Sequence, residues 1–590
     1  MRETAESRTA VFGTLRGQGE PTRGDADAVL AALEPACGRR YTLEAGPRRI
    51  RSSTYLDTAD GRLRRKGVRL THDRGSGPGA LTATRGEDTA STPLSAAPEW
   101  PALAGDLPDG DVRDLVAGRM SVRAVAPVLR TRTVTREVWV RDAGAAVVAA
   151  LVWRETTVQE PVRTAPFIRV DVLTVAGGEK PAKRIRKALC AAGSGDDDAA
   201  GADRRFRKDA GDLYEELLAE AGVPDRPQPP ELSADTPADV AVALALRVHA
   251  RTIAASVDGT IADVDTEYLH ELRVAVRRTR SLLKLAGDVL PARPVERYSP
   301  TLSWLGEVTG PTRDLDVYLL GFDDLAGRLA AGDPEDLAPF REHLHRERGR
   351  ARRALVRALR TRRFARLLEE WPAALTEVIG DADAESAAVD GADTAGDDTT
   401  GDNGSGEDTA GKDGPAGEDG AAGGAGTAGR AGASTGGTDG TAVPDVATFV
   451  RDRLARTAKK VTRKAAAITP ESPAEDVHNL RKRCKELRYL LEFARPLCPA
   501  AEHTAVLKRL KKLQDILGAF QDGEVQSTGL REHAGRMHEA GRAPAGALLA
   551  MGELAGAFAA DQRQARHELT AALQRFGDED IRGRITALVS

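Results

Sequence analysis

The chain has 590 residues, of which 41% are hydrophobic and 29% are charged, and its net charge is −4. A chain of this length exceeds what one hydrophobic core serves, so we expect two to four folding units. It contains neither an apolar run near the roughly 20 residues of a membrane span nor the apolar stretch of a secretory signal, which predicts a cytoplasmic protein without a membrane partner. Four cysteines without a Cys-x-x-Cys pair exclude a disulfide framework and a spaced zinc site.

The net charge hides a strong asymmetry along the chain. Residues 381–440 contain fourteen Asp or Glu against only Lys412 and Arg430, a net charge of −12, so the other 530 residues sum to +8. The same stretch is rich in Gly, Ala, Asp and Thr, and it cannot bury enough apolar surface to offset the entropy cost of ordering. We therefore predict a disordered acidic linker over residues 381–443, between folded parts that are basic.

Residues 1–222 carry a strand-like pattern. Short Val-rich runs with partial alternation span Val134–Val140, Ala146–Trp153 and Phe167–Val175, and Gly, Pro and Asp residues bound them. This pattern predicts an α+β domain with a substantial sheet. A proline-rich linker over residues 223–236 follows it.

Most of the chain beyond this linker has Leu, Ala, Arg and Glu at a period of 3 to 4, which predicts helical bundles over residues 237–380 and 444–590. The two stretches repeat each other at an offset of 208 residues, without a gap between positions 270 and 317. The matched pairs are His270 and His478, Leu272 and Leu480, Arg273 and Arg481, Arg277 and Lys485, Arg280 and Arg488, Gly310 and Gly518, and Asp314 and Asp522. Each copy therefore holds at least two helices in the same order.

One helix of the second copy has a recognisable start. Ser472 as the N-cap, Pro473 at the first helical position and Glu475 three residues after the serine together predict a capping box.

Cationic residues form a stripe on one helix of each copy. In the first copy they step by 3, 4, 3 and 4 residues, which aligns them on one helix face, and they are His270, Arg273, Arg277, Arg280 and Lys284. In the second copy they are His478, Arg481, Lys485 and Arg488. Like charges at this spacing repel each other by a few tenths of a kcal/mol per pair. Either a linear polyanion binds along the stripes, or acidic helices of the same chain neutralise them.

Three further basic segments either deepen this positive field or are solvated helix faces, and they span Arg341–Arg366, Arg451–Lys464 and Lys508–Lys512. We interpret Arg313, Asp314 and Asp316 as Asp–Arg pairs that close a helix junction. The sequence shows no nucleophile constellation and no Gly-x-x-x-x-Gly-Lys phosphate loop.

The repeated motifs resemble the CHAD domain, a histidine-containing α-helical module of prokaryotes. The resemblance covers about residues 236–590 and rests on His270–Arg280, Leu302–Val317 and His478–Tyr489. It implies two pseudo-symmetric four-helix bundles whose His and Arg/Lys stripes bind inorganic polyphosphate. The binding residues that we expect are His270, Arg273, Arg277, Arg280, Lys284, His478, Arg481, Lys482, Lys485, Arg488, Lys511 and Lys512.

The first 222 residues are similar in part to the CYTH triphosphate tunnel domain, because Tyr55–Leu70 matches its Tyr-x-Asp-Thr signature and the basic residues that follow. Met1–Arg40 lacks the family's Glu-x-Glu-x-Lys strand, and Phe167–Leu173 keeps only Asp171 of its alternating acids. Other positions where acids are expected are occupied by Ala150, Trp153, Arg154, Arg169 and Leu173. A degenerate CYTH-like domain without catalytic residues is therefore expected. Its basic positions hold phosphates or form an exposed hairpin, and they are Arg62, Arg64, Arg65, Lys66 and Arg69.

The sequence thus predicts a non-catalytic polyphosphate-binding protein without cofactor or metal, associated with polyphosphate granules. The alternative is an inorganic triphosphatase or related phosphohydrolase in the first domain, which would need Mg²⁺ or Mn²⁺ and carboxylate ligands. Nucleic acid is a less favoured partner, since the first stripe has no aromatic residue for base stacking and the second has only Tyr489 and Phe493 nearby. The oligomeric state stays open.

Overall fold

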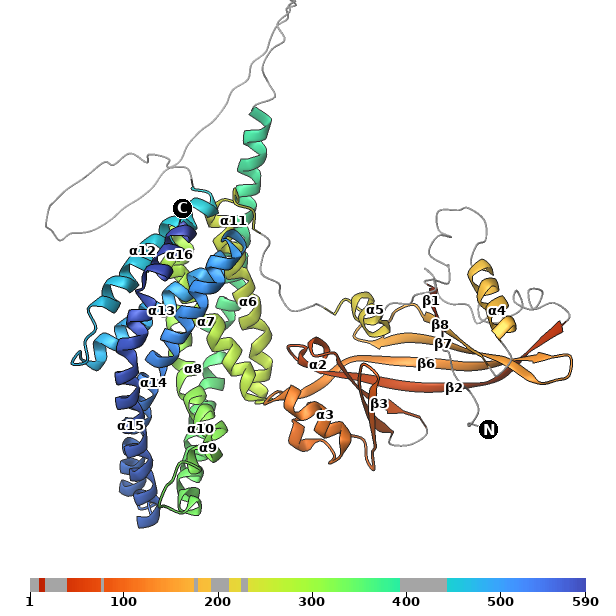
Figure 1. Ribbon diagram of the computed structural model, residues 1–590, viewed down its shortest axis with the longest axis horizontal. Coiled ribbons are helices and arrows are strands. Elements are labelled where there is room, and N and C mark those ends of the chain that lie inside the picture. Colours follow the sequence, from red (N-terminus) through yellow and green to blue (C-terminus); the bar gives the residue numbers. More distant parts are fainter. Residues whose placement is uncertain are drawn as a thin grey trace, which may run out of the picture.

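The computed structural model describes residues 10–15, 40–75, 79–174, 179–192, 212–223, 232–392 and 443–589. It has two parts: an antiparallel sheet domain near the N-terminus and a helical part that follows it (Figure 1). The helix α11 (Arg362–Ala392) continues into the segment 381–443, which was expected to be disordered. Residues 393–442 of that predicted linker lie outside the described residues.

The sheet contains β1 and the seven consecutive strands β2 to β8, in the order β1-β8-β7-β6-β2-β3-β4-β5. The strand bounds are β1 Ala10–Leu15, β2 Tyr41–Thr58, β3 Val68–Arg74, β4 Ala80–Arg85, β5 Asp88–Pro93, β6 Val125–Asp142, β7 Val147–Glu160 and β8 Phe167–Thr174. The three Val-rich runs lie in β6, β7 and β8, so the predicted sheet is confirmed. Among the strands that the structure describes, β1 and β5 pair on one side only, and the sheet is open.

Short helices cover the sheet domain, and their apolar residues form three separate clusters with it. The helix α4 (Glu179–Ala192) packs on β7 and β8, α3 (Asp111–Met120) and α2 (Arg62–Arg65) cover β3 and β4, and α5 (Leu213–Glu220) lies against Leu129 and Phe167. Tyr214 of α5 stacks on Tyr55 with ring centroids 4.9 Å apart. The resemblance of this domain to the CYTH family stays a prediction.

The helical part follows the repeat predicted from the sequence. Its long helices are α6 Ala238–Ala262, α7 Thr266–Ala286, α8 Ala292–Leu320, α10 Ala338–Leu359, α11, α12 Val446–Ala466, α13 Ala474–Ala494, α14 Ala500–Glu539, α15 Ala545–Phe576 and α16 Glu579–Val589, and α9 (Phe322–Ala326) is short. The first residues of α6, α7 and α8 lie 208 positions before those of α12, α13 and α14. The offset read from side chains is thus also the offset between helix starts.

One apolar core joins both copies of the repeat. Leu272 of α7, Leu302 of α8, Leu480 of α13 and Leu510 of α14 belong to the same buried cluster. A second cluster, with Phe340 and Leu554, fills the far ends of α8, α10, α14 and α15. The division into two four-helix bundles stays a prediction, because the halves share their main core.

The helix α6 is long and apolar enough to cross a membrane, judged by length and composition alone. Half of its most apolar stretch is buried within the protein, and its residues Val242 and Leu246 lie in the main core. A core helix of a soluble protein passes the same test, so this is weak evidence for a membrane span.

The predicted capping box at Ser472 is wrong. The helix α13 begins at Ala474 with Pro473 as its N-cap, and no side chain caps it. The Ser472 hydroxyl oxygen instead accepts a hydrogen bond of 2.9 Å from the Thr469 amide, in the turn before the helix. The counterpart of Pro473 before α7 is Asp265, whose carboxylate does cap that helix by accepting hydrogen bonds from the amides of Glu267 and Tyr268.

Candidate functional site

The cationic face of α7 lies against the backbone of α8. Arg273 donates hydrogen bonds of 3.2 Å to the Gly306 carbonyl and to the Thr309 hydroxyl. A Cβ added at Gly310 would lie 3.3 Å from Arg273 Nη1, and one at Gly306 only 2.8 Å from Arg280 Nη1. Glycine at both positions therefore lets the guanidinium groups approach the α8 backbone, where both hydrogen-bond partners of Arg273 are neutral.

The second copy repeats part of this arrangement. Arg481 of α13 lies next to Gly518 of α14, with 3.6 Å between its Nη2 and a Cβ added at that glycine. These two residues are the counterparts of Arg273 and Gly310 at the 208-residue offset. Arg481 also lies 3.8 Å from Asp522, an exposed carboxylate, so its charge is only loosely paired.

The two stripes meet between α7 and α13. Arg277 donates a 2.7 Å hydrogen bond to the Tyr489 hydroxyl of the other helix. Burial, and after it the positive charges of Arg481, Arg277 and Arg488, together lower the pKa of Lys485 to about 8, while Asp522 opposes them. Arg277 and Lys485 are counterparts in the repeat, so equivalent cations of the two halves lie close enough for the charge of Arg277 to lower the pKa of Lys485.

Ion pairs on either side of this meeting point hold α7 and α13 together. Arg278 pairs with Glu492 at 3.0 Å, and Lys284 pairs with Glu486 at 2.7 Å. In the repeat, the cation Arg278 is the counterpart of the acid Glu486, and the cation Lys284 is the counterpart of the acid Glu492. Each cation therefore pairs with the counterpart of the other one. Lys284 was expected to bind a ligand, but the structure gives it a partner within the protein.

The two histidines lie at the N-terminal ends of their stripes and differ in environment. His478 Nδ1 lies 2.6 Å from Gln521 Oε1, which can only accept, so the ring donates. His270 is half-buried, and this burial lowers its pKa together with the charges of Arg313 and Arg277, against the opposing charges of Glu267 and Glu271. Arg313 and Gln521 are counterparts at the same offset, so the repeat itself marks the residues that lie beside the two histidines.

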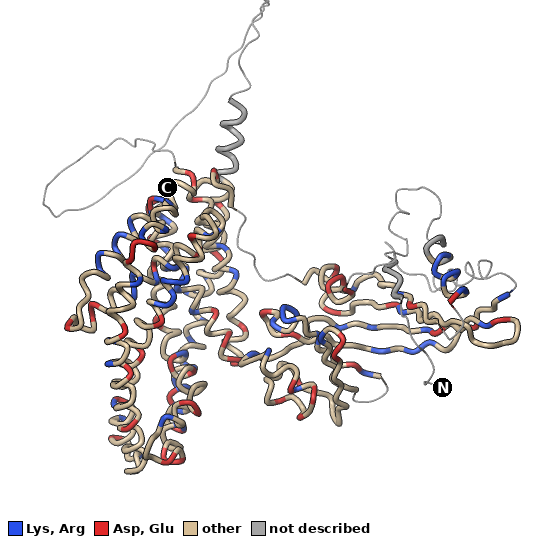
Figure 2. The backbone as a smooth tube through the Cα atoms, viewed as in Figure 1, with Lys and Arg blue, Asp and Glu red and all other residues tan. Residues whose placement is uncertain are grey.

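The remaining expected residues lie at the edge of this region. Arg488 donates a 2.9 Å hydrogen bond to Glu492 and a 3.4 Å bond to Gln514. Lys482, Lys511 and Lys512 are exposed on α13 and α14, and none of them forms an ion pair with another described residue. The arrangement as a whole concentrates positive charge between α7 and α13, where Figure 2 shows many Lys and Arg positions.

Comparison with known families agrees with this geometry. Residues 244–531, which include both stripes, match the family model of the CHAD domain. This part of the chain is a CHAD domain. The CHAD domain from the plant Ricinus communis resembles the chain with 24% identity and a TM-score of 0.43, over 60% of this chain and 96% of that one. PptA from Streptomyces chartreusis does so with 15% identity and a TM-score of 0.38, over 57% of this chain and 100% of that one. No curated protein matches the sequence.

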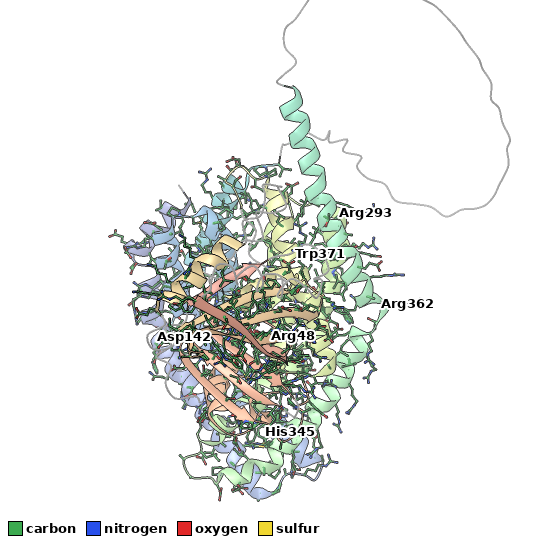
Figure 3. All side chains as sticks on the ribbon, turned by 90° about the vertical axis from the view of Figure 1, so that its right-hand side faces the viewer. Arg48, Asp142, Arg293, His345, Arg362 and Trp371 are labelled. Carbon is green, nitrogen blue, oxygen red and sulfur yellow. The ribbon has the colours of Figure 1, made fainter. Side chains whose placement is uncertain are left out.

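The other basic segments of the CHAD domain are partly neutralised. Arg348 of α10 pairs with Asp263 at 2.7 Å and with Asp316 at 2.6 Å, which confirms Asp316 as part of an Asp–Arg helix junction. Arg363 stacks over Trp304, 4.5 Å from the ring centroid. Arg362, at the start of α11, is exposed at the outer edge of the helical part (Figure 3). These contacts favour the interpretation of the segment Arg341–Arg366 as structural and solvated.

Acids of the same chain pair with most of the basic residues in the Tyr55–Leu70 motif. Arg62 and Arg65 pair with Asp60, Arg64 with Glu215 and Arg69 with Asp212. Lys66 donates to the Arg119 carbonyl at 3.3 Å. The arginines of this motif are therefore engaged within the protein, which disfavours their role as phosphate ligands.

The described carboxylates of the sheet domain have separate partners and do not gather into a metal site. Asp57 accepts hydrogen bonds from the amides of Thr58, Leu63 and Arg64, so it stabilises the turn after β2. Asp171 is buried and pairs with Arg154. In the parts of the chain that the structure describes, no group of three or more His, Cys, Asp or Glu could hold a metal ion. The triphosphatase alternative thus has no ligand set among these residues.

Proposed function

We propose that the CHAD domain binds inorganic polyphosphate, without catalysis, in the region between α7 and α13. The observation that supports this most directly is the meeting of Arg277 and Lys485. Burial is the main reason that the pKa of Lys485 is lowered to about 8, and the positive charges of Arg481 and Arg277 add to the shift. An aromatic hydroxyl, not an acid, is the hydrogen-bond partner of Arg277. A protein gains no stability from such repulsion, so a ligand that removes it is the simplest explanation.

The chemistry of the site suits a chain of phosphates. Arginine forks donate paired hydrogen bonds to phosphate oxygens, and lysine acts as a point charge. Arg273 and Arg481 occupy equivalent positions in the two halves, beside Gly310 and Gly518, so each half contributes an arginine to the positive charge. A linear polyanion can follow such a stripe, whereas a single phosphate would meet only part of it. We place Arg280, Lys482, Lys511 and Lys512 at the margins of this site.

The proposal extends to the organisation and location of the protein. We regard residues 237–380 and 444–590 as the two related halves of the binding unit, joined by the acidic linker 381–443. The sheet domain would be a degenerate CYTH-like domain, which the Tyr55–Leu70 motif at the end of β2 supports. Binding of polyphosphate would place the protein in the cytoplasm, at polyphosphate granules.

Titration of the full-length protein with polyphosphates of defined length tests the function. Affinity should rise with chain length until the ligand spans both stripes. It should also fall by about tenfold or more between about 50 and 200 mM salt, because bound phosphates release counterions. Single-stranded DNA at equal phosphate concentration should compete weakly. An affinity independent of salt, or stronger binding of DNA than of polyphosphate, would contradict the proposal.

The triphosphatase alternative has its own measurement. It requires phosphate release from tripolyphosphate with Mg²⁺ or Mn²⁺, and loss of that activity in an Asp171→Ala variant. We expect no release above background, since Asp171 is already paired with Arg154.

A further inference from the structure

The sheet domain contacts the CHAD domain through one buried arginine. Arg123, just before β6, has a side chain that is 0% exposed. Its guanidinium group lies 2.6 Å from a carboxylate oxygen of Glu271 and 3.3 Å from one of Asp265, both at the N-terminal end of α7. It also lies over the ring of Tyr268, 5.0 Å from the centroid. A fully buried cation held by two acids and an aromatic ring of another domain fixes the position of that domain.

Two neighbouring contacts complete this junction, which appears where the sheet domain meets the helices in Figure 1. The Ala124 amide donates a 3.1 Å hydrogen bond to Asp265, and Arg62 of α2 donates a 3.0 Å bond to Glu267. The sheet domain therefore engages all three carboxylates in the first turns of α7, those of Asp265, Glu267 and Glu271. Two of them, Glu267 and Glu271, lie close enough to His270 to act on its pKa, at the position where the cationic stripe begins.

The residues that hold Arg123 occur in the first copy of the repeat only. At the 208-residue offset, Asp265 corresponds to Pro473, Tyr268 to Asp476 and Glu271 to Asn479. Gly259 of α6 is also specific to the first copy, since a Cβ there would lie 2.3 Å from the Tyr268 ring and its counterpart is Ala467. The start of α7 is thus built to receive the sheet domain, and the start of α13 is not.

The acids have an electrostatic consequence for the stripe. With the sheet domain in place, Arg62 and Arg123 neutralise Glu267 and Glu271. Without it, the same carboxylates would present negative charge at the first turns of a helix that is to bind phosphates. Once separated from these arginines, the two carboxylates would add negative charge next to the stripe and weaken the binding of a phosphate chain.

We propose that Arg123 is a positioning residue of the polyphosphate site: it docks the sheet domain on α7 and thereby keeps Asp265 and Glu271 from repelling the ligand. This inference rests on the proposed function. It gives the sheet domain a role that needs no ligand of its own, because the domain raises the affinity of the CHAD domain for a polyanion.

The test compares Arg123→Gln with Arg130→Gln in the full-length protein. Arg130 lies in the same domain, its side chain is 51% exposed and it pairs with Glu160, so its variant removes the same charge away from the junction. Small-angle X-ray scattering reports the docking, and titration with a polyphosphate of defined length reports the affinity. Arg123→Gln should increase the radius of gyration and lower the affinity by about tenfold, whereas Arg130→Gln should change neither.

A second substitution separates electrostatics from folding. Adding Glu271→Asn, the residue of the second copy, to Arg123→Gln should restore most of the affinity while the scattering still shows a loosened junction. If Arg123→Gln does not fold, Arg62→Gln with and without Glu267→Gln provides the same comparison with a smaller effect. Two results would overturn this inference but leave the proposed function standing. One is an Arg123→Gln variant that undocks but keeps its affinity for polyphosphate. The other is a loss of affinity that Glu271→Asn does not restore. Wild-type protein that binds no polyphosphate would overturn the proposed function and the coupling together.

Discussion

Two basic segments of this protein differ in the partners of their side chains. In the sheet domain, Arg64 and Arg69 of the Tyr55–Leu70 motif pair with Glu215 and Asp212 of α5. In the CHAD domain, Arg273 and Arg277 reach a backbone carbonyl, a threonine hydroxyl and a tyrosine hydroxyl, which are all neutral. The first set forms ion pairs within the chain, whereas the second set is hydrogen-bonded to neutral groups, with the charge of Asp314 acting on Arg273 from nearby.

The difference shows that a count of cations says little about binding. Exposed ion pairs contribute at most about 1 kcal/mol each, so the pairs of the sheet domain are ordinary surface stabilisation. Cations held beside other cations are different, because their repulsion raises the free energy of the empty site and is removed when an anion binds. At Lys485, burial and then the charges of Arg481 and Arg277 together lower the pKa to about 8, so part of that shift is this repulsion.

The largest effect should come from removing the central cations. Arg277→Gln combined with Lys485→Gln should weaken polyphosphate binding by about 100-fold, since each hydrogen bond to a charged group contributes about 1.5 kcal/mol. The matched control, Arg64→Gln combined with Arg69→Gln, should keep the affinity within about twofold, because those arginines already have acidic partners. Isothermal titration of both double variants makes the comparison. Equal losses would show that overall charge, and not the site, determines binding.

The pH dependence should distinguish Lys485 from every other cation. Its pKa is lowered to about 8, and a bound polyanion raises it, so binding takes up a proton above that pH. Affinity is therefore greatest below pH 8 and should fall about tenfold from about pH 7 to about pH 9. Lys485→Arg keeps the charge throughout this range and should remove the dependence. A wild-type affinity that is constant from about pH 7 to about pH 9 would contradict the assignment of Lys485 to the site.

Much of the helical part could be predicted from the sequence because the repeat preserves spacing. The 208-residue offset located both stripes, and the helices α7 and α13 begin at equivalent positions. Spacing alone could not show which helix faces which. The pairing of Lys284 with Glu486 depends on two helices of different copies meeting with their chains reversed, a feature that no local period encodes.

Contacts between distant segments were also beyond the sequence pattern. The acids that hold Arg123 lie more than one hundred residues away in the chain, and Asp265 was not singled out at all. The prediction of a capping box at Ser472 was wrong because the serine hydroxyl accepts a hydrogen bond from the Thr469 amide in the preceding turn. The differences between the two copies, at 265, 268 and 271, were visible in the sequence, but only the docked domain gave them a meaning.

Lys284 allows an intermediate test, since it belongs to the stripe by spacing and to the paired residues by contact. Lys284→Gln should reduce the affinity for polyphosphate by less than about threefold, because the Lys284 ammonium group already forms an ion pair with Glu486. A double-mutant cycle with Glu486→Gln, followed by urea unfolding, should give a coupling energy of about 0.5 kcal/mol, as expected for a lysine that is 61% exposed. A loss of affinity as large as that of the central double variant would return Lys284 to the binding site.

A comparably small effect is expected at the histidines, which begin both stripes but lie next to different groups. Burial and the nearby Arg313 and Arg277 lower the pKa of His270 from 6.5, and bound phosphates would raise it again, so affinity should increase as the pH falls below 6.5. The increase should be about threefold for one partly protonated imidazole. The double variant His270→Gln and His478→Gln should lose this dependence but keep the one above pH 8, which belongs to Lys485. If acid still strengthens binding in the double variant, the proton is taken up elsewhere, and the histidines at the starts of the stripes serve the fold alone.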